Sequence, residues 1–216
     1  HPFKTTLALD SHIGEVEHRV RSEQELAVAM RSMLSHGMHV NVSLQGASAG
    51  KMQGLVEKIN HYLPALIPWS FSSPFHEGKE FSGLCCRNYF RADSRRMADV
   101  HDRHGYRVLE FRGFDACGDL TLLEAILCLY CGFLLDETLP GRSPEQDPAL
   151  LKHSALVGFG DPSLKSLGQQ LLSASQAMMP DYKEPFELLE QMLEQNDSYA
   201  GRMKRKYMET GNVMNC

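Results

Sequence analysis

The residues best suited to chemistry fall on two segments in which apolar and polar residues alternate. The first is MHVNVSL over residues 38–44, and the second is YRVLEFRGFD over residues 106–115. Strict alternation predicts a half-buried strand, in which every second side chain points to the same face. His39 and Asn41 therefore share one face of the first strand. Glu110 and Arg112 share one face of the second, about 7 Å apart along it.

If both strands belong to one antiparallel sheet, these four side chains are displayed on the face that does not pack on helices. Carboxylate and imidazole groups ligate Mg²⁺ or Mn²⁺, and arginine pairs in bidentate fashion with phosphate or carboxylate. The set suits a site for a divalent cation and phosphates. The alternative is an ordinary solvated sheet face with an ion pair between Glu110 and Arg112, and the pattern alone leaves both interpretations open.

Other single residues carry weaker signals, each with a structural alternative. Arg87 follows a glycine-containing loop and could bind a carboxylate, although a surface arginine fits as well. Asp115 could be a ligand or a helix cap, and His76 a substrate contact or a solvated loop residue. His101 and His104 have the spacing of two metal ligands on a helix but lie in a polar segment. The sequence contains no P-loop, GxGxxG, HExxH or GxSxG motif.

Composition limits the class of protein. The chain has 216 residues, 43% hydrophobic and 23% charged, which predicts one domain or a domain with an appended subdomain. Its formal net charge of −5 gives no electrostatic basis for binding nucleic acid or an anionic membrane. The apolar stretch over residues 120–135 is too short to span a bilayer and carries Glu124. We therefore expect neither nucleic acid nor a membrane as a partner.

The six cysteines do not have the spacing of a disulfide framework, so we expect them to be reduced and the protein to be cytoplasmic. Cys128 and Cys131 form a CxxC pair, but a zinc site would need a second such pair. Because the two lie inside an apolar stretch, we interpret them as buried helix cysteines.

Helical periodicity predicts helices over residues 14–36, 49–62, 119–136, 147–157, 163–178, 184–195 and 197–209. Asp119 is the natural N-cap of the third of these. Residues 64–83 are rich in proline, serine and glycine and predict a long loop or a broken helix. The charged residues 87–104 predict a surface segment. Few strands and many helices indicate an α+β fold.

Several short motifs follow one another along the chain. They are HPF at residues 1–3, GMHVNV at 37–42, LP at 63–64, SSPF at 72–75, Gly78, the segment 83–87 and LEFRGFD at 109–115. In this order and spacing the set resembles the glutamate–cysteine ligase family, taken in its broad carboxylate–amine ligase sense. The resemblance covers about residues 1–180.

The resemblance implies an antiparallel sheet of glutamine-synthetase-like type packed on helices, with a helical C-terminal region. It places a ligase-like α+β domain over residues 1–180 and a helical C-terminal extension over residues 181–216. The implied activity is an ATP-dependent ligation with Mg²⁺ or Mn²⁺ and amino-acid substrates, glutamate and cysteine for example. The γ-carboxylate of glutamate takes the γ-phosphoryl group of ATP, and an amine attacks the acyl phosphate to form an amide.

Carried over residue by residue, the resemblance makes His39 and Glu110 metal ligands on adjacent strands. Arg112 would bind ATP and stabilise the transferring phosphoryl group, and Asn41 would add a polar contact near the metal. Arg87 would be a second catalytic residue that holds a substrate carboxylate or a phosphate.

In the same carry-over, Ser73, Pro74 and Phe75 would shape the substrate pocket. The chain departs from the family pattern at Ser72, where asparagine is usual, and at Asn41, where many members have histidine. Cys85 and Cys86 stand in place of a serine and an aromatic residue.

Family members are usually longer, and their portion before the HPF motif carries further metal-binding carboxylates. Glu15 and Glu17 lie in helix-like surroundings, so we do not count them as ligands. We therefore expect that the sequence corresponds to the C-terminal portion of the family, as a fragment or as a chain whose site is completed by a homo-oligomer or a complementing chain. One alternative is a non-catalytic ligase-fold subunit or binding module, and another is a histidine-based metal hydrolase.

Overall fold

The computed structural model describes residues 37–44, 46–93, 95–103 and 106–212. The predicted helix over 14–36, the HPF motif, Glu15, Glu17 and His104 lie outside the described residues. The described residues all belong to one compact unit.

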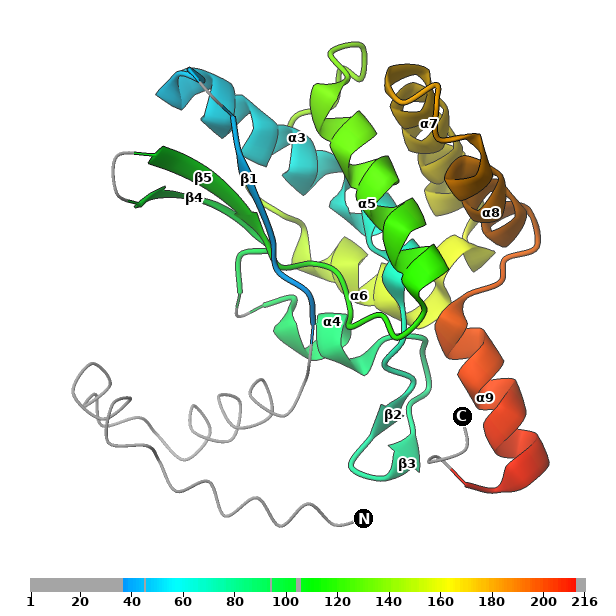
Figure 1. Ribbon diagram of the computed structural model, residues 1–216. Helices are drawn as coiled ribbons and strands as arrows, with labels where there is room; N and C mark the ends of the chain where they lie inside the picture. The colour runs from blue at the N-terminus through cyan, green and yellow to red at the C-terminus, as the bar shows by residue number, and fades with distance from the viewer. Residues whose placement is uncertain (1–36, 45, 94, 104–105, 213–216) are drawn as a thin grey trace, which may run out of the picture. The chain divides into compact units, whose positions relative to one another are not determined.

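Three antiparallel strands form the main sheet: β1 (Val40–Ser43), β4 (Ala98–Arg103) and β5 (Tyr106–Phe111), in the order β1-β5-β4 (Figure 1). The structure confirms the predicted strands 38–44 and 106–115, both shorter than predicted. Strand β4 was not predicted, because the charged side chains of residues 87–104 indicated a surface segment. Within that segment, Ala98 and Val100 alternate with Asp99 and His101, which is the pattern of a half-buried strand.

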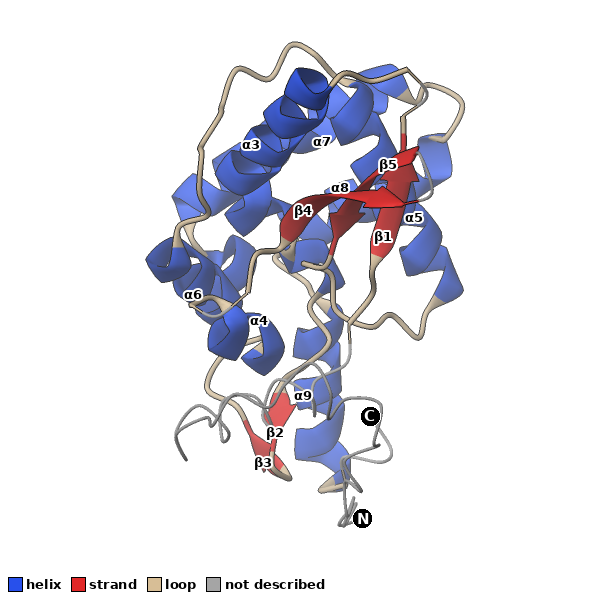
Figure 2. Ribbon diagram, turned by 90° about the vertical axis from the view of Figure 1, so that its left-hand side faces the viewer, coloured by secondary structure: helices blue, strands red, loops and turns tan. Residues whose placement is uncertain are grey.

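Seven helices and two short 3₁₀ segments make up most of the remaining described structure (Figure 2). The α-helices are α3 (Ala49–Leu66), α4 (Cys86–Arg91), α5 (Leu120–Leu135), α6 (Pro148–Val157), α7 (Pro162–Met178), α8 (Lys183–Glu194) and α9 (Tyr199–Thr210). The 3₁₀ segments are η1 (Pro68–Ser70) and η2 (Gly158–Gly160). Asp119 caps α5 by accepting from the N–H groups of Thr121 and Leu122, which confirms the predicted N-cap. The described residues are therefore α+β.

The segment 64–83, predicted as a long loop or a broken helix, begins as helix and then forms a short hairpin. Helix α3 continues through Pro64 to Leu66, and η1 follows it directly. A two-stranded hairpin of β2 (Phe75–His76) and β3 (Lys79–Glu80) then turns through Glu77 and Gly78, both at positive φ. The helix predicted over 49–62 is too short, because Pro64 was expected to end it. In the structure, packing of α3 in the core compensates for the N–H that Pro64 lacks.

The apolar face of the sheet packs on helices. Leu109 and Phe111 of β5 are fully buried, and the Phe111 ring stacks on Tyr130 of α5 with centroids 4.9 Å apart. Helix α3 packs along β4, and α5 packs in turn against α7 and α8 (Figure 1). No helix of the described residues is long and apolar enough to cross a membrane. On α5, Cys128 is buried as predicted, whereas Cys131 is exposed.

The helices of the predicted extension over residues 181–216 belong to the same compact unit as the sheet. Phe186 and Leu189 of α8 are buried, and the Trp69 indole N–H donates to the Leu189 carbonyl at 3.3 Å. At the start of α9, the Ala200 N–H donates to the Phe71 carbonyl at 2.8 Å. Both helices therefore pack on the segment that leads into the β2–β3 hairpin.

A buried lysine closes the C-terminal end of α5. The Lys58 ammonium of α3 donates to the carbonyls of Phe133 and Asp136 and lies 3.3 Å from the Asp136 carboxylate. The last carbonyls of a helix have no partner within the helix, so the lysine satisfies groups that water cannot reach. Burial lowers the pKa of Lys58, and its pairing with Asp136 opposes that shift.

We expect Lys58→Met to lower the free energy of unfolding by about 3–5 kcal/mol, because it leaves the Asp136 charge and two carbonyls unpaired in the interior. Urea unfolding at pH 7 measures the change. Lys51→Met is the matched control on the same helix: the Lys51 side chain is 59% exposed and 3.7 Å from Glu137, so its loss should cost less than about 1 kcal/mol. Equal effects of the two substitutions would contradict the capping role of Lys58.

Candidate functional site

The antiparallel register places polar side chains from all three strands on one face of the sheet. Asn41 of β1 and Asp99 of β4 are both register partners of Glu110 on β5, and register partners point to the same side. We call this surface, formed by His39, Asn41, Asp99, His101, Glu110 and Arg112, the polar face. The structure thus brings together the four side chains that the sequence predicted to share a face.

Glu110 lies at the centre of the polar face and is contacted from three sides. Its Oε1 lies 2.9 Å from His39 Nδ1, and its Oε2 lies 3.0 Å from His101 Nε2. Arg112 Nη2 donates to Oε2 at 2.6 Å and lies 3.0 Å from His101 Nε2. The Glu110 side chain is only 8% exposed, whereas that of His39 is 48% exposed. The cluster is therefore open to solvent at the imidazole of His39 and closed around the carboxylate.

Arg112 keeps this carboxylate charged. Its hydrogen bond is the largest cause that lowers the pKa of Glu110, to about 2, with the positive charges of Arg112 and His39 adding to the effect against burial. The same hydrogen bond raises the pKa of Arg112. At neutral pH the polar face therefore presents a fixed negative charge flanked by a fixed positive charge, a pair that can attract a cation and an anion side by side.

His101 belongs to this cluster, and the sequence did not indicate that it would. Its spacing to His104 suggested either two metal ligands on a helix or solvated histidines, because the strand that carries His101 was not predicted. The alternation over residues 98–103 was the signal that could have placed it on the polar face.

The two residues predicted to hold a metal, His39 and Glu110, are in direct contact. Among the described residues, no three His, Cys, Asp or Glu side chains are arranged to hold a metal ion. Mg²⁺ takes about six ligands, mostly oxygens, so this pair would hold it only with oxygen ligands from elsewhere or from the substrate. Asn41 is exposed beside them on β1, and its predicted contact near the metal stays a prediction.

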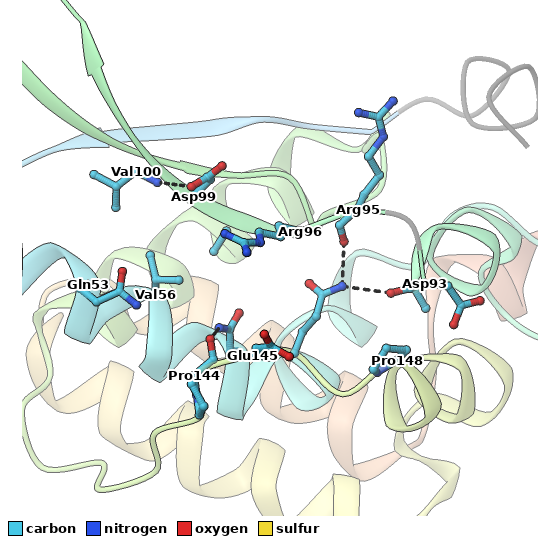
Figure 3. A pocket seen from close by; sticks show the side chains of 14 residues that line it. Gln53, Val56, Asp93, Arg95, Arg96, Asp99, Val100, Pro144, Glu145 and Pro148 are labelled. Atoms are coloured by element: carbon cyan, nitrogen blue, oxygen red, sulfur yellow. Dashed lines mark hydrogen bonds between the residues drawn. The ribbon is translucent and has the colours of Figure 1, made fainter. Parts of the chain in front are cut away.

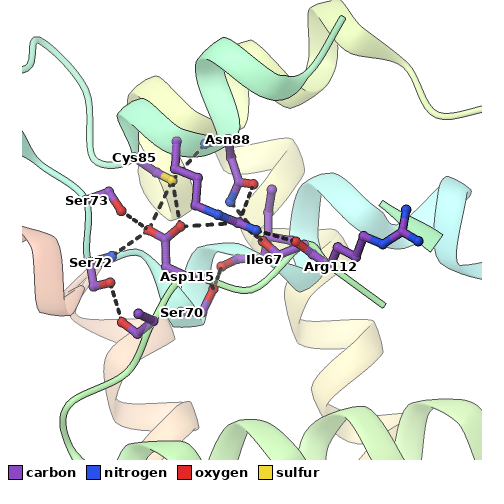
Figure 4. A network of polar contacts seen from close by, with 11 residues as sticks. Ile67, Ser70, Ser72, Ser73, Cys85, Asn88, Arg112 and Asp115 are labelled. Atoms are coloured by element: carbon purple, nitrogen blue, oxygen red, sulfur yellow. Dashed lines mark hydrogen bonds and ion pairs between the residues drawn. The ribbon is translucent and has the colours of Figure 1, made fainter. Parts of the chain in front are cut away.

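A second polar network lies buried behind the end of β5 (Figure 4). The Asp115 carboxylate accepts hydrogen bonds from the Ser72 N–H and the Ser73 hydroxyl at 2.9 Å each, and from the Cys85 thiol at 3.1 Å. The guanidinium of Arg87 lies 3.6 Å from it. Burial raises the pKa of Asp115, and the charge of Arg87 opposes that shift. We call these residues the Asp115 network.

Arg87 is part of this network and is 1% exposed. It donates to the carbonyls of Arg112 at 2.6 Å and Gly113 at 3.3 Å, and Asn88 donates to the Gly113 carbonyl at 3.0 Å. A fully buried guanidinium cannot meet a substrate from solution, so this geometry does not support the prediction that Arg87 binds one. The structure instead supports a positioning role for Arg87. Its guanidinium holds the backbone carbonyl of Arg112, and the Arg112 side chain contacts Glu110.

The predicted pocket residues Ser73 and Phe75 also lie near this network. The Ser73 hydroxyl is bound to Asp115, whereas Phe75 is half-buried with its ring 5.1 Å from that of Tyr207 on α9. Burial, followed by the Asp115 charge, raises the pKa of Cys85 well above its usual range. Cys85 is therefore a neutral structural thiol rather than a nucleophile.

Comparison with protein families and with curated proteins finds no match. No protein-family model matches the chain, and no curated protein matches it in sequence.

We expect Arg112→Gln to raise the pKa of Glu110 from about 2 toward its ordinary value near 4.5, because the substitution removes the largest cause of the shift. A carbon-13 NMR titration of the carboxyl group measures this. Since the folded pKa is lowered, the stability that Glu110 contributes is present above about pH 4.5 and is lost as the pH falls toward 2. That loss should be smaller in the variant. Arg107→Gln, a half-exposed arginine on the same strand, should leave the Glu110 titration unchanged.

We expect Gly37→Ala to lower the free energy of unfolding by about 1–3 kcal/mol, because a Cβ there would lie 2.2 Å from Arg87 Cζ and displace the buried guanidinium. Gly54→Ala on α3 is the control: a Cβ there meets nothing within 4 Å, and the helix should gain about 0.5–1 kcal/mol. Urea unfolding of both variants measures the difference. A Gly37→Ala protein as stable as the parent would show that the Asp115 network tolerates displacement of Arg87.

Proposed function

We propose that this chain carries the polar sheet face of an ATP- and Mg²⁺-dependent carboxylate–amine ligase, of the glutamate–cysteine ligase type that its motifs resemble. The observation that supports the proposal is the cluster of His39, Glu110 and Arg112 on adjacent strands, with the carboxylate held ionised. In this proposal the sheet is of the glutamine-synthetase-like type.

The chemistry of the cluster fits such a reaction. The γ-phosphoryl group of ATP is transferred to a carboxylate oxygen of the acid, and ADP leaves. The amine nitrogen then attacks the acyl carbon, phosphate leaves with the acyl oxygen, and the nitrogen loses a proton. Such a reaction needs positioned charges rather than a protein nucleophile. The neutral, buried thiol of Cys85 agrees with that requirement.

The residues take the following parts in the proposal. His39 and Glu110 would ligate Mg²⁺, which neutralises phosphate charge when bound. Arg112 would donate to the transferring phosphoryl group with N–H groups that do not contact Glu110. Asn41 would contact ATP beside Arg112. Arg87 would hold the backbone of Arg112 from behind the sheet.

One observation favours a second candidate, a non-catalytic ligase-fold subunit or binding module. The described residues offer too few ligands for Mg²⁺. In that case a homo-oligomer or a complementing chain would supply further carboxylates beside His39, and this chain would bind ATP or amino acids without turning them over alone.

We expect the purified chain, once its mass is verified, to release phosphate from ATP when supplied with Mg²⁺, glutamate and an amine from a panel that includes cysteine. With hydroxylamine as the amine, a hydroxamate should form, which reports an acyl phosphate directly. Glu110→Gln and Arg112→Ala should each lower the rate by about 100-fold or more, because each removes charge stabilisation at the phosphoryl group. Arg107→Gln, half-exposed on β5, is the matched control and should retain the parental rate.

The outcomes separate the two candidates. Phosphate release that depends on acid and amine, and that is lost in the two variants, supports the ligase. A folded chain without turnover that still binds Mg²⁺–ATP through Arg112 supports the binding module. A chain that does neither contradicts both.

A further inference from the structure

A cavity of about 570 Å³ lies between β4 and α3 (Figure 3), and it shares Asp99 with the polar face. Its walls come from three segments that are distant in the sequence: the middle of α3, the residues that lead into β4, and the segment before α6. They contribute Gln53, Val56 and Asn60, then Ala92, Asp93, Arg95, Arg96, Ala98, Asp99 and Val100, then Pro144, Glu145, Gln146 and Pro148. Nothing in the proposed ligase reaction uses this cavity.

The walls are held in place by two buried or half-buried amides. The Gln146 side chain accepts from the Met97 N–H at 3.0 Å. It donates to the carbonyls of Ala92 at 3.1 Å and Arg95 at 2.7 Å (Figure 3). Asn60 donates to the carbonyl of Pro144 at 3.2 Å. These bonds join the three segments, so the cavity is formed without a ligand and binding would cost little reorganisation.

Five charged residues line the cavity, and two of them with opposite charge, Arg96 and Glu145, have exposed side chains. Of the other carboxylates, Asp93 pairs with Lys152 and Asp99 accepts from the Val100 N–H. Arg96 extends across the space between β4 and the segment that carries Glu145, whereas Arg95 extends away from it (Figure 3). Within the described part of the chain, neither the Arg96 nor the Glu145 side chain has an ion-pair or hydrogen-bond partner. Val56, Val100 and Pro144 supply apolar surface between them.

We propose that this cavity binds an amino acid with an apolar side chain, in its zwitterionic form. Arg96 takes the carboxylate, Glu145 takes the ammonium group, and the side chain rests on Val56 and Val100. A ligand with both charges satisfies both ends of the cavity at once, whereas a simple cation or anion leaves one end unpaired. The volume exceeds that of one free amino acid, which leaves room for ordered water. The site is independent of the proposed ligase reaction.

L-Leucine is the probe, and its binding to the full chain can be followed by isothermal titration and by NMR shifts of the cavity residues. Two analogues each lack one charged group: 4-methylpentanoate lacks the ammonium group, and 3-methylbutan-1-amine lacks the carboxylate. We expect saturable leucine binding that each deletion weakens by about tenfold or more. Arg96→Gln and Glu145→Gln should weaken leucine binding to a similar extent.

Two control variants place the site. Arg95→Gln changes the same charge one residue away and should leave leucine affinity unchanged. Glu110→Gln alters the polar face and should also leave it unchanged, even if it abolishes ligation. The proposal is overturned if leucine binds no better than both analogues, if Arg95→Gln costs as much as Arg96→Gln, or if the shifts map to the polar face.

Discussion

The arrangement of the candidate site depends on one buried ion pair, between Arg87 of α4 and Asp115 just beyond β5. Removing two charges from water costs several kcal/mol per ion, so such a pair persists only where further groups satisfy both partners. Here three donors from residues 72–85 form hydrogen bonds to the Asp115 carboxylate. Two carbonyls just beyond β5 accept from the Arg87 guanidinium. The pair therefore fixes the hairpin segment, α4 and the end of β5 relative to one another.

The polar face could be predicted because side-chain direction in a strand follows residue number alone. Alternation over residues 38–44 and 106–115 placed His39, Glu110 and Arg112 on one surface, and the register confirms it. Residues 98–103 show the same alternation, but their many charges favoured a surface segment, so β4 was not predicted. His101 was missed for that reason, although its contact with Glu110 is as short as that of His39.

Whether a side chain is buried was harder to predict than the face of the strand to which it points. Whether an arginine lies on the surface or in the interior depends on its partner, and Asp115 is remote from Arg87 in the sequence. The end of α3 was also mispredicted, at residue 62 instead of Leu66. Burial of α3 in the core stabilises the helix by more than Pro64 destabilises it. The C-terminal helices carried no recognised motif, yet Phe186 and Leu189 complete the core beneath α5. Tertiary partners, rather than local propensity, decided each case.

The hydrogen bond from Ala200 to the Phe71 carbonyl has a consequence for the order in which the chain folds. Lys204 of α9 also pairs with Glu80 of the hairpin at 3.1 Å. These contacts join segments that leave the ribosome at very different times. The hairpin region gains these contacts only after α9 has been synthesised, so a nascent chain lacks the cover that Tyr207 gives to the half-buried Phe75 until residues 199–210 have emerged.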